Sequence, residues 1–206
     1  MITEEIMKSG EMYNSMDAEL FELQWEYNDL MYEYNSMKPS DRKGQQRILK
    51  KLLGDMGEGC VIEPPLRANW GKNTHLGNRV YANFNLTLVD DADVYIGDDV
   101  MIGPNVTIAT AGHPLDAELR KKGMQFNKSV HIGSGVWLGS GVIILPGVTI
   151  GEKTTIGAGS VVTKDIPANV VAYGNPCRIR KNLSFFRYHF FCDSFFRFIF
   201  SENPVK

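Results

Sequence analysis

The residue best placed for acid–base chemistry in this sequence is His113, between Gly112 and Pro114, where a regular pattern gives way to a polar stretch. A neutral imidazole can accept a proton near pH 7, so it can serve as a general base toward a hydroxyl group. The chain has four histidines, and a histidine taken alone is more often structural or solvated than catalytic. Residue type and position alone therefore leave a catalytic and a structural role for His113 equally open.

Several other side chains offer polar chemistry. Asn83 has hydrogen-bond donors and an acceptor, whereas an ionised Asp91 only accepts, so the two can orient a hydroxyl group. A chain turn is the alternative role of each. Lys164 and Arg178 can make charge-assisted contacts to phosphate, although Lys164 alone is also typical of a solvated surface charge. Trp137 interrupts a run of small residues and is either the wall of a groove or a packing residue.

The composition limits the possible classes of function. The 206 residues include 22 Lys and Arg against 24 Asp and Glu, so no basic excess indicates nucleic-acid binding. No run of about 18 apolar residues could span a bilayer, and the acidic N-terminus does not resemble a signal peptide. Cys60, Cys177 and Cys192 fit neither a disulfide framework nor a zinc site. We therefore expect a cytoplasmic protein with no metal, no membrane and no nucleic acid among its partners.

A six-residue repeat predicts the element that positions these side chains. An aliphatic or small residue recurs at every sixth position from Ile132 to Ala168, and an earlier stretch in the same phase runs from Ile96 to Ile108. Hexads of this kind are typical of a parallel β-helix, in which each hexad forms one flat side of a coil. Stacked coils bury one another's inward side chains, so no coil is stable alone.

The repeat shifts its phase in the first coils, which begin near Val61. Leu76 and Ile96 each restart the pattern two residues late. We expect each shift to enlarge a corner, near Asn73-Thr74 and near Asp90-Asp91, because Asn and Asp favour turns.

The repeat is also interrupted between Ile108 and Val130, where the residues are polar and charged. It resumes in phase after a whole number of hexads. Residues from about 113 to 129 are therefore predicted to form one excursion from a coil. Long excursions from a rigid scaffold commonly carry functional residues.

The first 57 residues have a different composition, since only three of the 20 glycines precede position 57. Apolar residues at three-four spacing, from Leu20 through Leu23 to Tyr34, predict a helix of roughly five turns. Pro39 marks a break before a second helix that ends at Gly57. Two packed helices could cap an open end of the β-helix. The expected domains are a helical domain at 1–57, a β-helix domain at 58–181 and a tail of uncertain structure at 182–206.

The tail is rich in aromatic residues, because eight of the eleven phenylalanines fall between Phe185 and Phe200. It is too short and too charged for a membrane span. Packing on the helical domain, packing at an oligomer interface and an altered reading frame are the alternatives. We expect the tail to be dispensable for catalysis.

Several segments together resemble the maltose/galactoside O-acetyltransferase group of the hexapeptide-repeat acyltransferases. Besides the hexads, they are EEIMKSGEMY (4–13), NFNLTLVDD (83–91), PNVTIATAGHP (104–114), VVTKDIP (161–167) and GNPCR (174–178). The likeness runs from about residue 3 to residue 181 and fails in the tail, where the family usually has a more polar ending. The resemblance implies a left-handed β-helix and a homotrimer with active sites between subunits. It also implies acetyl-CoA as the donor and a sugar hydroxyl as the acceptor.

The resemblance also implies roles for individual residues. His113 would be the general base that takes the proton of the attacking sugar hydroxyl in a ternary complex. The backbone amide of Ser140 would stabilise the oxyanion, and Asn83 would orient the acceptor. Further acceptor-binding residues would be Asn69, Tyr81 and Asp91. The residues that bind CoA would be Trp137, Ser140, Ala158, Thr163, Lys164 and Arg178.

Three alternatives to a sugar acetyltransferase follow from the sequence. One is an acyltransferase for a different small acceptor. Another is a zinc-dependent carbonic anhydrase on the same solenoid, which needs three imidazoles converging between subunits. Only His113 is suitably placed for that, with His75 and His131 as weaker candidates. The third is a non-catalytic solenoid used for assembly, although His113, Asn83 and the excursion together argue against it. No Walker or dinucleotide glycine motif supports the use of ATP or NAD.

Overall fold

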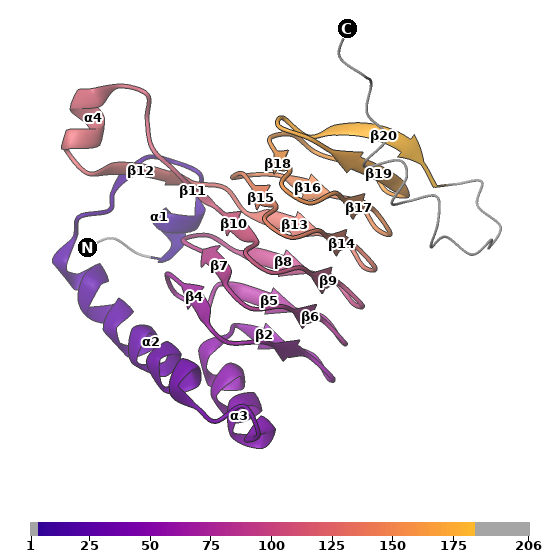
Figure 1. Cartoon of the computed structure of the whole chain (residues 1–206). Coiled ribbons are helices and arrows are strands. Elements are labelled where there is room, and N and C mark those ends of the chain that lie inside the picture. The colour runs from indigo at the N-terminus through magenta and orange to yellow at the C-terminus, as the bar shows by residue number, and fades with distance from the viewer. Residues whose placement is uncertain (1–3, 184–206) are drawn as a thin grey trace, which may run out of the picture.

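The computed structural model describes residues 4–183 and shows a left-handed parallel β-helix with helices packed at one end (Figure 1). Of the tail predicted at 182–206, residues 184–206 lie outside the described residues. Within residues 4–183, no helix is long and apolar enough to cross a bilayer.

Three sheets form the three sides of the β-helix, and the chain visits them in turn. Side 1 consists of β2 (Asp55–Met56), β5 (Thr74–Leu76), β8 (Val94–Ile96), β13 (Val130–Ile132) and β16 (Thr149–Ile150). Side 2 consists of β3 (Val61–Ile62), β6 (Tyr81–Ala82), β9 (Met101–Ile102), β14 (Trp137–Leu138), β17 (Thr155–Ile156), β19 (Val170–Tyr173) and the antiparallel β20 (Arg178–Asn182). Side 3 consists of β4 (Leu66–Ala68), β7 (Leu86–Val89), β10 (Thr107–Ala109), β15 (Ile143–Ile144) and β18 (Val161–Val162).

The strand register confirms the predicted hexads and the enlarged corners. Ile62, Ala82 and Ile102 stack in register at a spacing of 20 residues, and Leu138 stacks on Ile156 at a spacing of 18. All of these side chains are buried in one continuous core. The two extra residues of the early coils lie at the corner between side 3 and side 1, where Asp90 and its neighbours are buried.

The last coil differs from the predicted repeat. Ala168 is exposed, so the prediction that it continues the inward row was wrong. Ile166 bridges to Ile150 instead, and the coil closes after 16 residues. The Asp165 carboxylate accepts the Thr149 N–H at 2.8 Å, so a side chain replaces part of the backbone ladder and shortens the coil.

The helical segment consists of α1 (Glu4–Lys8), β1 (Tyr13–Asn14), α2 (Ala18–Ser36) and α3 (Arg42–Leu52). The 19 residues of α2 confirm the predicted five-turn helix. Leu23 is 58% exposed, so its place on the buried stripe was wrongly predicted; Met31 and Tyr34 pack on the core. The second helix ends at Leu52 and not at Gly57, because the N–H groups of Gly54 and Gly57 already bond to side 1 of the next coil.

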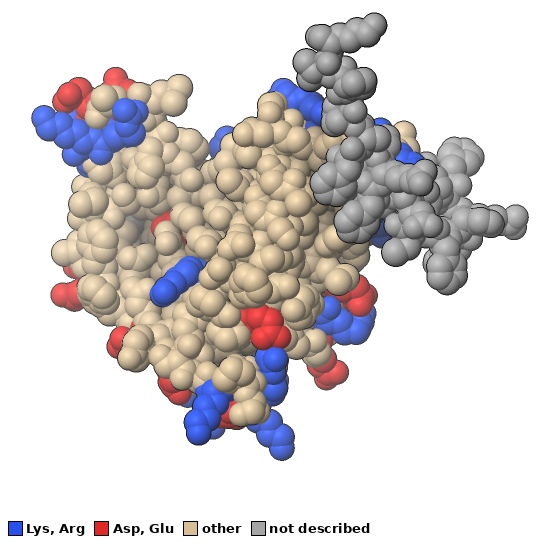
Figure 2. All heavy atoms as spheres, in the orientation of Figure 1, with Lys and Arg blue, Asp and Glu red and all other residues tan. Residues whose placement is uncertain are grey.

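The predicted excursion is present as β11 (Ala111–Gly112), α4 (Ala117–Lys121) and β12 (Met124–Asn127), and we call residues 111–127 the flap. Strand β12 pairs with β1 on one edge and with β11 on the other, in a three-stranded sheet of order β1-β12-β11. Figure 1 shows the flap projecting from the β-helix beside the N-terminal segment. Charged side chains gather at its α4 tip, while the face of the coils drawn in Figure 2 is mostly uncharged.

Candidate active site

A groove of about 360 Å³ lies on side 2 of the β-helix. One row of its lining residues occupies equivalent outward positions on successive strands: Tyr81, Met101, Trp137 and Thr155. The side chains of Tyr81, Met101 and Trp137 are 37%, 56% and 45% exposed, so the row presents apolar surface to a ligand. The sequence analysis missed Met101, although its place 20 residues after Tyr81 in the coil register could have indicated it.

The floor of this groove is mostly backbone. Each strand of the outward row has a second lining residue two positions later in the sequence. On successive coils these residues are Asn83, Gly103, Gly139 and Gly157. A Cβ atom on Gly139 would lie 2.6 Å from the backbone nitrogen of Ala158, so only glycine permits this spacing of the coils. Ser140 and Ala158 complete the lining. The groove thus unites five predicted site residues, namely Tyr81, Asn83, Trp137, Ser140 and Ala158.

A second group of predicted residues lies at the enlarged corner between side 3 and side 1. The Asn69 side-chain amide donates a hydrogen bond of 2.7 Å to the Asp91 carboxylate. Asp91 is 8% exposed, and its second carboxylate oxygen has capacity to accept a further hydrogen bond. The flap leaves the β-helix from this same corner, one coil further along.

His113 directly follows β11 and is exposed. Its Nδ1 lies 3.0 Å from the backbone carbonyl oxygen of Met124. A carbonyl oxygen only accepts hydrogen bonds, so this contact assigns the proton to Nδ1. The lone pair of the neutral imidazole is then on Nε2, which can accept a proton from a bound molecule.

Asp90 supports the corner that contains Asn69 and Asp91, and it was not singled out as a site residue from the sequence. Its carboxylate accepts hydrogen bonds from the Trp70 N–H at 2.9 Å and from the Thr74 hydroxyl at 3.2 Å. Burial raises the pKa of Asp90 to about 7, and the nearby charge of Asp91 adds to the increase. The carboxyl group thereby fixes the loop that contains Asn69. The Asp-Asp pair in the sequence was the available signal for it.

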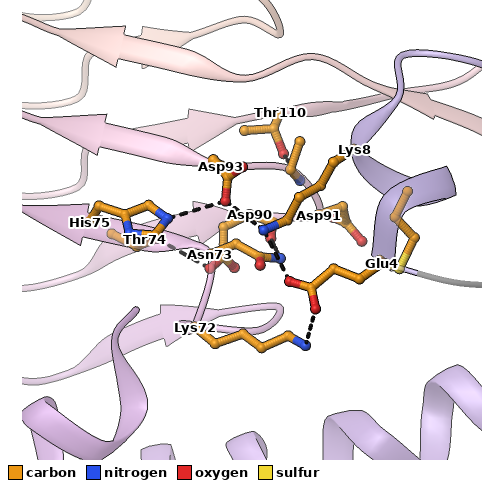
Figure 3. A network of polar contacts seen from close by, with 12 residues as sticks. Glu4, Lys8, Lys72, Asn73, Thr74, His75, Asp90, Asp91, Asp93 and Thr110 are labelled. Atoms are coloured by element: carbon orange, nitrogen blue, oxygen red, sulfur yellow. Dashed lines mark hydrogen bonds and ion pairs between the residues drawn. The ribbon is translucent and has the colours of Figure 1, made fainter. Parts of the chain in front are cut away.

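An ion-pair network attaches α1 to the same corner (Figure 3). Lys8 lies 2.7 Å from the Asp93 carboxylate and 3.0 Å from Glu4. His75 contacts Asp93 at 3.1 Å from its other side. Although burial opposes the change, hydrogen bonds from Lys8 and His75 lower the pKa of Asp93. The network fixes α1 over the corner, and no local sequence pattern indicated it because Lys8 and Asp93 are 85 positions apart.

The residues predicted to meet the nucleotide end of CoA lie elsewhere. Thr163 and Lys164 are exposed just beyond β18, and Arg178 begins β20. The Arg178 guanidinium donates to the Cys177 carbonyl oxygen at 2.8 Å. All three lie at the end of the β-helix remote from the helices and outside the lining of the groove (Figure 1).

The remaining histidines have a different environment. The rings of His75 and His131 stack on opposite faces of Tyr95, with centroids 4.8 and 4.9 Å away, on side 1. Within residues 4–183, no group of three or more His, Cys, Asp or Glu side chains is arranged to hold a metal ion. The two imidazoles flank Tyr95 and do not face a common point within the chain.

The fold and the site define a hexapeptide-repeat transferase. Residues 129–164 match the family model described as bacterial transferase hexapeptide (six repeats), and residues 6–57 match the maltose acetyltransferase hexapeptide capping motif. A galactoside O-acetyltransferase of Lactococcus lactis subsp. lactis (strain IL1403) is 51% identical over 175 residues, which are 84% of each chain.

Two solved structures agree with these matches. A galactoside acetyltransferase in complex with coenzyme A superposes with a TM-score of 0.85 at 46% identity, covering 89% of this chain and 92% of the other. A maltose O-acetyltransferase from Clostridium difficile 630 superposes with a TM-score of 0.87 at 43% identity, covering 89% and 98%. The chain therefore belongs to the galactoside/maltose O-acetyltransferase family of hexapeptide-repeat acyltransferases.

Proposed function

We propose that the protein transfers the acetyl group of acetyl-CoA to a hydroxyl group of a sugar such as maltose, glucose or a galactoside. Family membership and the coenzyme A bound to a relative support the donor. The observation that carries the chemistry is the contact between His113 Nδ1 and the Met124 carbonyl, which leaves Nε2 available as a base.

In the proposed reaction, the sugar oxygen attacks the thioester carbon while His113 Nε2 takes its proton. The C–S bond then breaks, and the imidazolium returns that proton to the CoA sulfur, so the enzyme is unchanged. Both substrates are bound together, and no covalent enzyme intermediate is needed. Cys60 and Cys177 are buried, which is consistent with a mechanism that has no cysteine nucleophile.

The acceptor and the oxyanion need oriented partners. We assign the backbone amide of Ser140 to the oxyanion, where loss of one donor typically costs ~3–4 kcal/mol in the transition state. Asn83 would orient the attacking hydroxyl with Tyr81. Asn69 and Asp91, already joined by a hydrogen bond, would hold neighbouring hydroxyl groups, and we call the corner that they form the acceptor corner.

The donor would lie along side 2. Trp137, Ser140 and Ala158 line the groove in which a pantetheine arm would fit, with backbone at its floor. Thr163, Lys164 and Arg178 would meet the nucleotide and its phosphates further along the β-helix, where charge-assisted hydrogen bonds are strong.

We further propose that the enzyme is a homotrimer. The groove with Asn83 and the corner with Asp91 and His113 lie on different edges of one chain. Three chains around a threefold axis would bring the groove of one chain to the corner of the next and form three complete sites. We also propose a cytoplasmic location. The proposed domains are 1–57, 58–181 and 182–206, although β2 (Asp55–Met56) of the β-helix lies before the first boundary and β20 (Arg178–Asn182) crosses the second by one residue.

The test is thiol release from acetyl-CoA against a panel of sugars, with wild type and His113→Ala side by side. We expect sugar-dependent release that falls by about 10²–10⁴-fold in His113→Ala, the range for loss of a general base. His131→Ala, which alters a histidine on side 1, is the matched control and should retain activity.

Near wild-type turnover by His113→Ala would refute the assigned base. No release with any sugar from folded protein would instead favour another small acceptor or an assembly-only solenoid.

A further inference from the structure

The flap that carries His113 is attached to the N-terminal segment by three buried polar side chains, Tyr13, Gln125 and Asn127, which we call the flap anchor. Their side chains are 5%, 7% and 0% exposed. Tyr13 belongs to β1, whereas Gln125 and Asn127 belong to β12, more than 100 residues later. Polar groups buried this deeply must satisfy one another, because each lost partner leaves an unpaired group away from water.

The three side chains satisfy one another closely. The Tyr13 hydroxyl oxygen accepts hydrogen bonds from the amides of Gln125 and Asn127, both at 2.9 Å. The Gln125 amide also donates to the Asn127 side-chain oxygen at 2.9 Å. Asn127 further reaches the backbone carbonyl of Met7 at 2.8 Å, so it ties the flap to α1 as well. A buried hydrogen-bond network of this kind favours one arrangement over its alternatives.

The anchor also touches the acceptor corner directly. The Asn127 amide nitrogen lies 3.3 Å from the backbone carbonyl oxygen of Asp91. Beside it, the buried Thr110 hydroxyl accepts the Ala92 N–H at 2.9 Å and donates to the Val89 carbonyl at 2.8 Å. The backbone on both sides of Asp91 is therefore fixed by residues at the base of the flap.

The strand register transmits this attachment to His113. Tyr13 pairs with Gln125 and Asn14 pairs with Met124, so β1 sets the place of β12. On the other edge of β12, Ala111 pairs with Asn127 and Gly112 pairs with Phe126. His113 follows immediately, and its Nδ1 meets the Met124 carbonyl. The imidazole thus rests on a strand whose position depends on the anchor.

We propose that Tyr13, Gln125 and Asn127 are positioning residues for acetyl transfer, which hold the His113 imidazole at a fixed place relative to Asp91. The inference rests on the proposed function, because it concerns the same base and the same acceptor corner. Such positioning matters because a displacement of about 1 Å at a reacting group can cost ~10²-fold in rate.

The first test compares Tyr13→Phe with wild type in sugar acetylation. The substitution keeps the ring, which packs with Met7, Leu20 and Trp70, and removes only the hydroxyl group. We expect kcat to fall about tenfold or more, with the KM for acetyl-CoA unchanged because the groove on side 2 is untouched. Asn127→Asp, which replaces the donor nitrogen by an oxygen, should reproduce the loss.

Tyr34→Phe is the matched control. Tyr34 is also fully buried, and its hydroxyl group donates to the Ile62 carbonyl under the helices, away from the flap. It should lower the melting temperature without changing kcat. A fall in kcat that merely reflects weaker folding would occur in both tyrosine variants and would overturn the proposal.

A double-mutant cycle separates positioning from general damage. If the anchor acts through His113, adding Tyr13→Phe to His113→Ala should leave the residual turnover unchanged. An equal fold-loss in both backgrounds, or a fully active Tyr13→Phe enzyme, would overturn the proposal while the proposed function stands. A fully active His113→Ala enzyme would contradict the proposed function itself, and the anchor proposal with it.

Discussion

At the scale of single residues, Asp90 links the acceptor corner to pH. Its carboxyl group is buried, and this burial raises its pKa from 3.8 to about 7 in the folded protein. Between about pH 4 and pH 7 the folded state therefore binds more protons at this site than the unfolded chain does. The associated stability is fully present below about pH 4 and is lost as the pH rises through 7.

Asp90→Asn should remove this dependence. The new amide oxygen can accept the Trp70 N–H, and its nitrogen can donate to the Thr74 hydroxyl, so the geometry is retained. We expect a flatter stability profile between pH 4 and 7 and a gain on the order of 2–4 kcal/mol at pH 8, since one pKa unit corresponds to ~1.4 kcal/mol. Urea unfolding at pH 5 and pH 8 measures both.

Asp99→Asn is the control for that profile. Asp99 is exposed at another corner, and a hydrogen bond from Arg79 lowers its pKa, so it titrates below this window. Its substitution should leave the change in the free energy of unfolding between pH 5 and 8 as it is in the wild type. If Asp90→Asn also shows the wild-type change, a group other than Asp90 is responsible for the pH dependence.

Inward-facing residues were predictable from the hexads, whereas the site residues were predicted from the family resemblance. The family resemblance assigned Tyr81 and Asn83 to the acceptor and Trp137 to CoA, and the regular coil register brings all three to one groove. The flap anchor was not predictable, because Tyr13 meets Asn127 across 114 positions of sequence and neither shows a periodicity. Such partners are set by how a flap folds back on the chain, which short-range patterns do not contain.

At the scale of elements, the stacking of coils depends on glycine where two backbones meet. A Cβ atom on Gly133 would lie 2.6 Å from the backbone nitrogen of Glu152. Gly133→Ala should therefore separate two coils and destabilise the fold by about 1–3 kcal/mol, the usual cost of overpacking. Thermal or urea unfolding measures the loss.

Gly135, two positions further along the same corner, provides the contrast. Its φ is +69°, and a Cβ atom there would lie 3.4 Å from the Lys153 side chain. Asn169 adopts φ of 59° at this corner of another coil, so Gly135→Asn should change stability by less than about 1 kcal/mol. Equal losses in the two variants would contradict the role given to close backbone approach.

The elements themselves were predictable as far as the hexads are regular. The helix α2 and the coils through Val162 follow from spacing alone. The end of α3 and the shortened last coil do not, because hydrogen bonds to a neighbouring coil override the local pattern. Tertiary partners thus decide the boundaries at both ends of the β-helix.

At the scale of the whole molecule, one chain presents two incomplete halves of the proposed site. Asn83 follows side 2, whereas His113 follows side 3 and projects on the flap (Figure 1). The sequence contains the residues of both halves, but the separation of Asn83 and His113 depends on the corner of the β-helix at which each one lies. Only the folded register shows that they lie on different edges.

This separation makes subunit complementation the decisive test of the proposed trimer. His113→Ala and Asn83→Ala chains should each be nearly inactive alone. Co-expressed with different tags and purified through both, mixed trimers of 23.1 kDa chains should each contain one site with both residues intact. We therefore expect about one third of wild-type activity per mixed trimer.

Light scattering must first give a mass of three chains, since a monomer with full activity would already exclude a shared site. Mixed trimers no more active than either variant alone would place His113 and Asn83 in the same site of one chain. Recovery of activity requires that they come from two chains, because each mixed trimer then joins an unaltered His113 to an unaltered Asn83. The complete active site would then be a property of the assembly, with each chain supplying the base to one site and the groove to another.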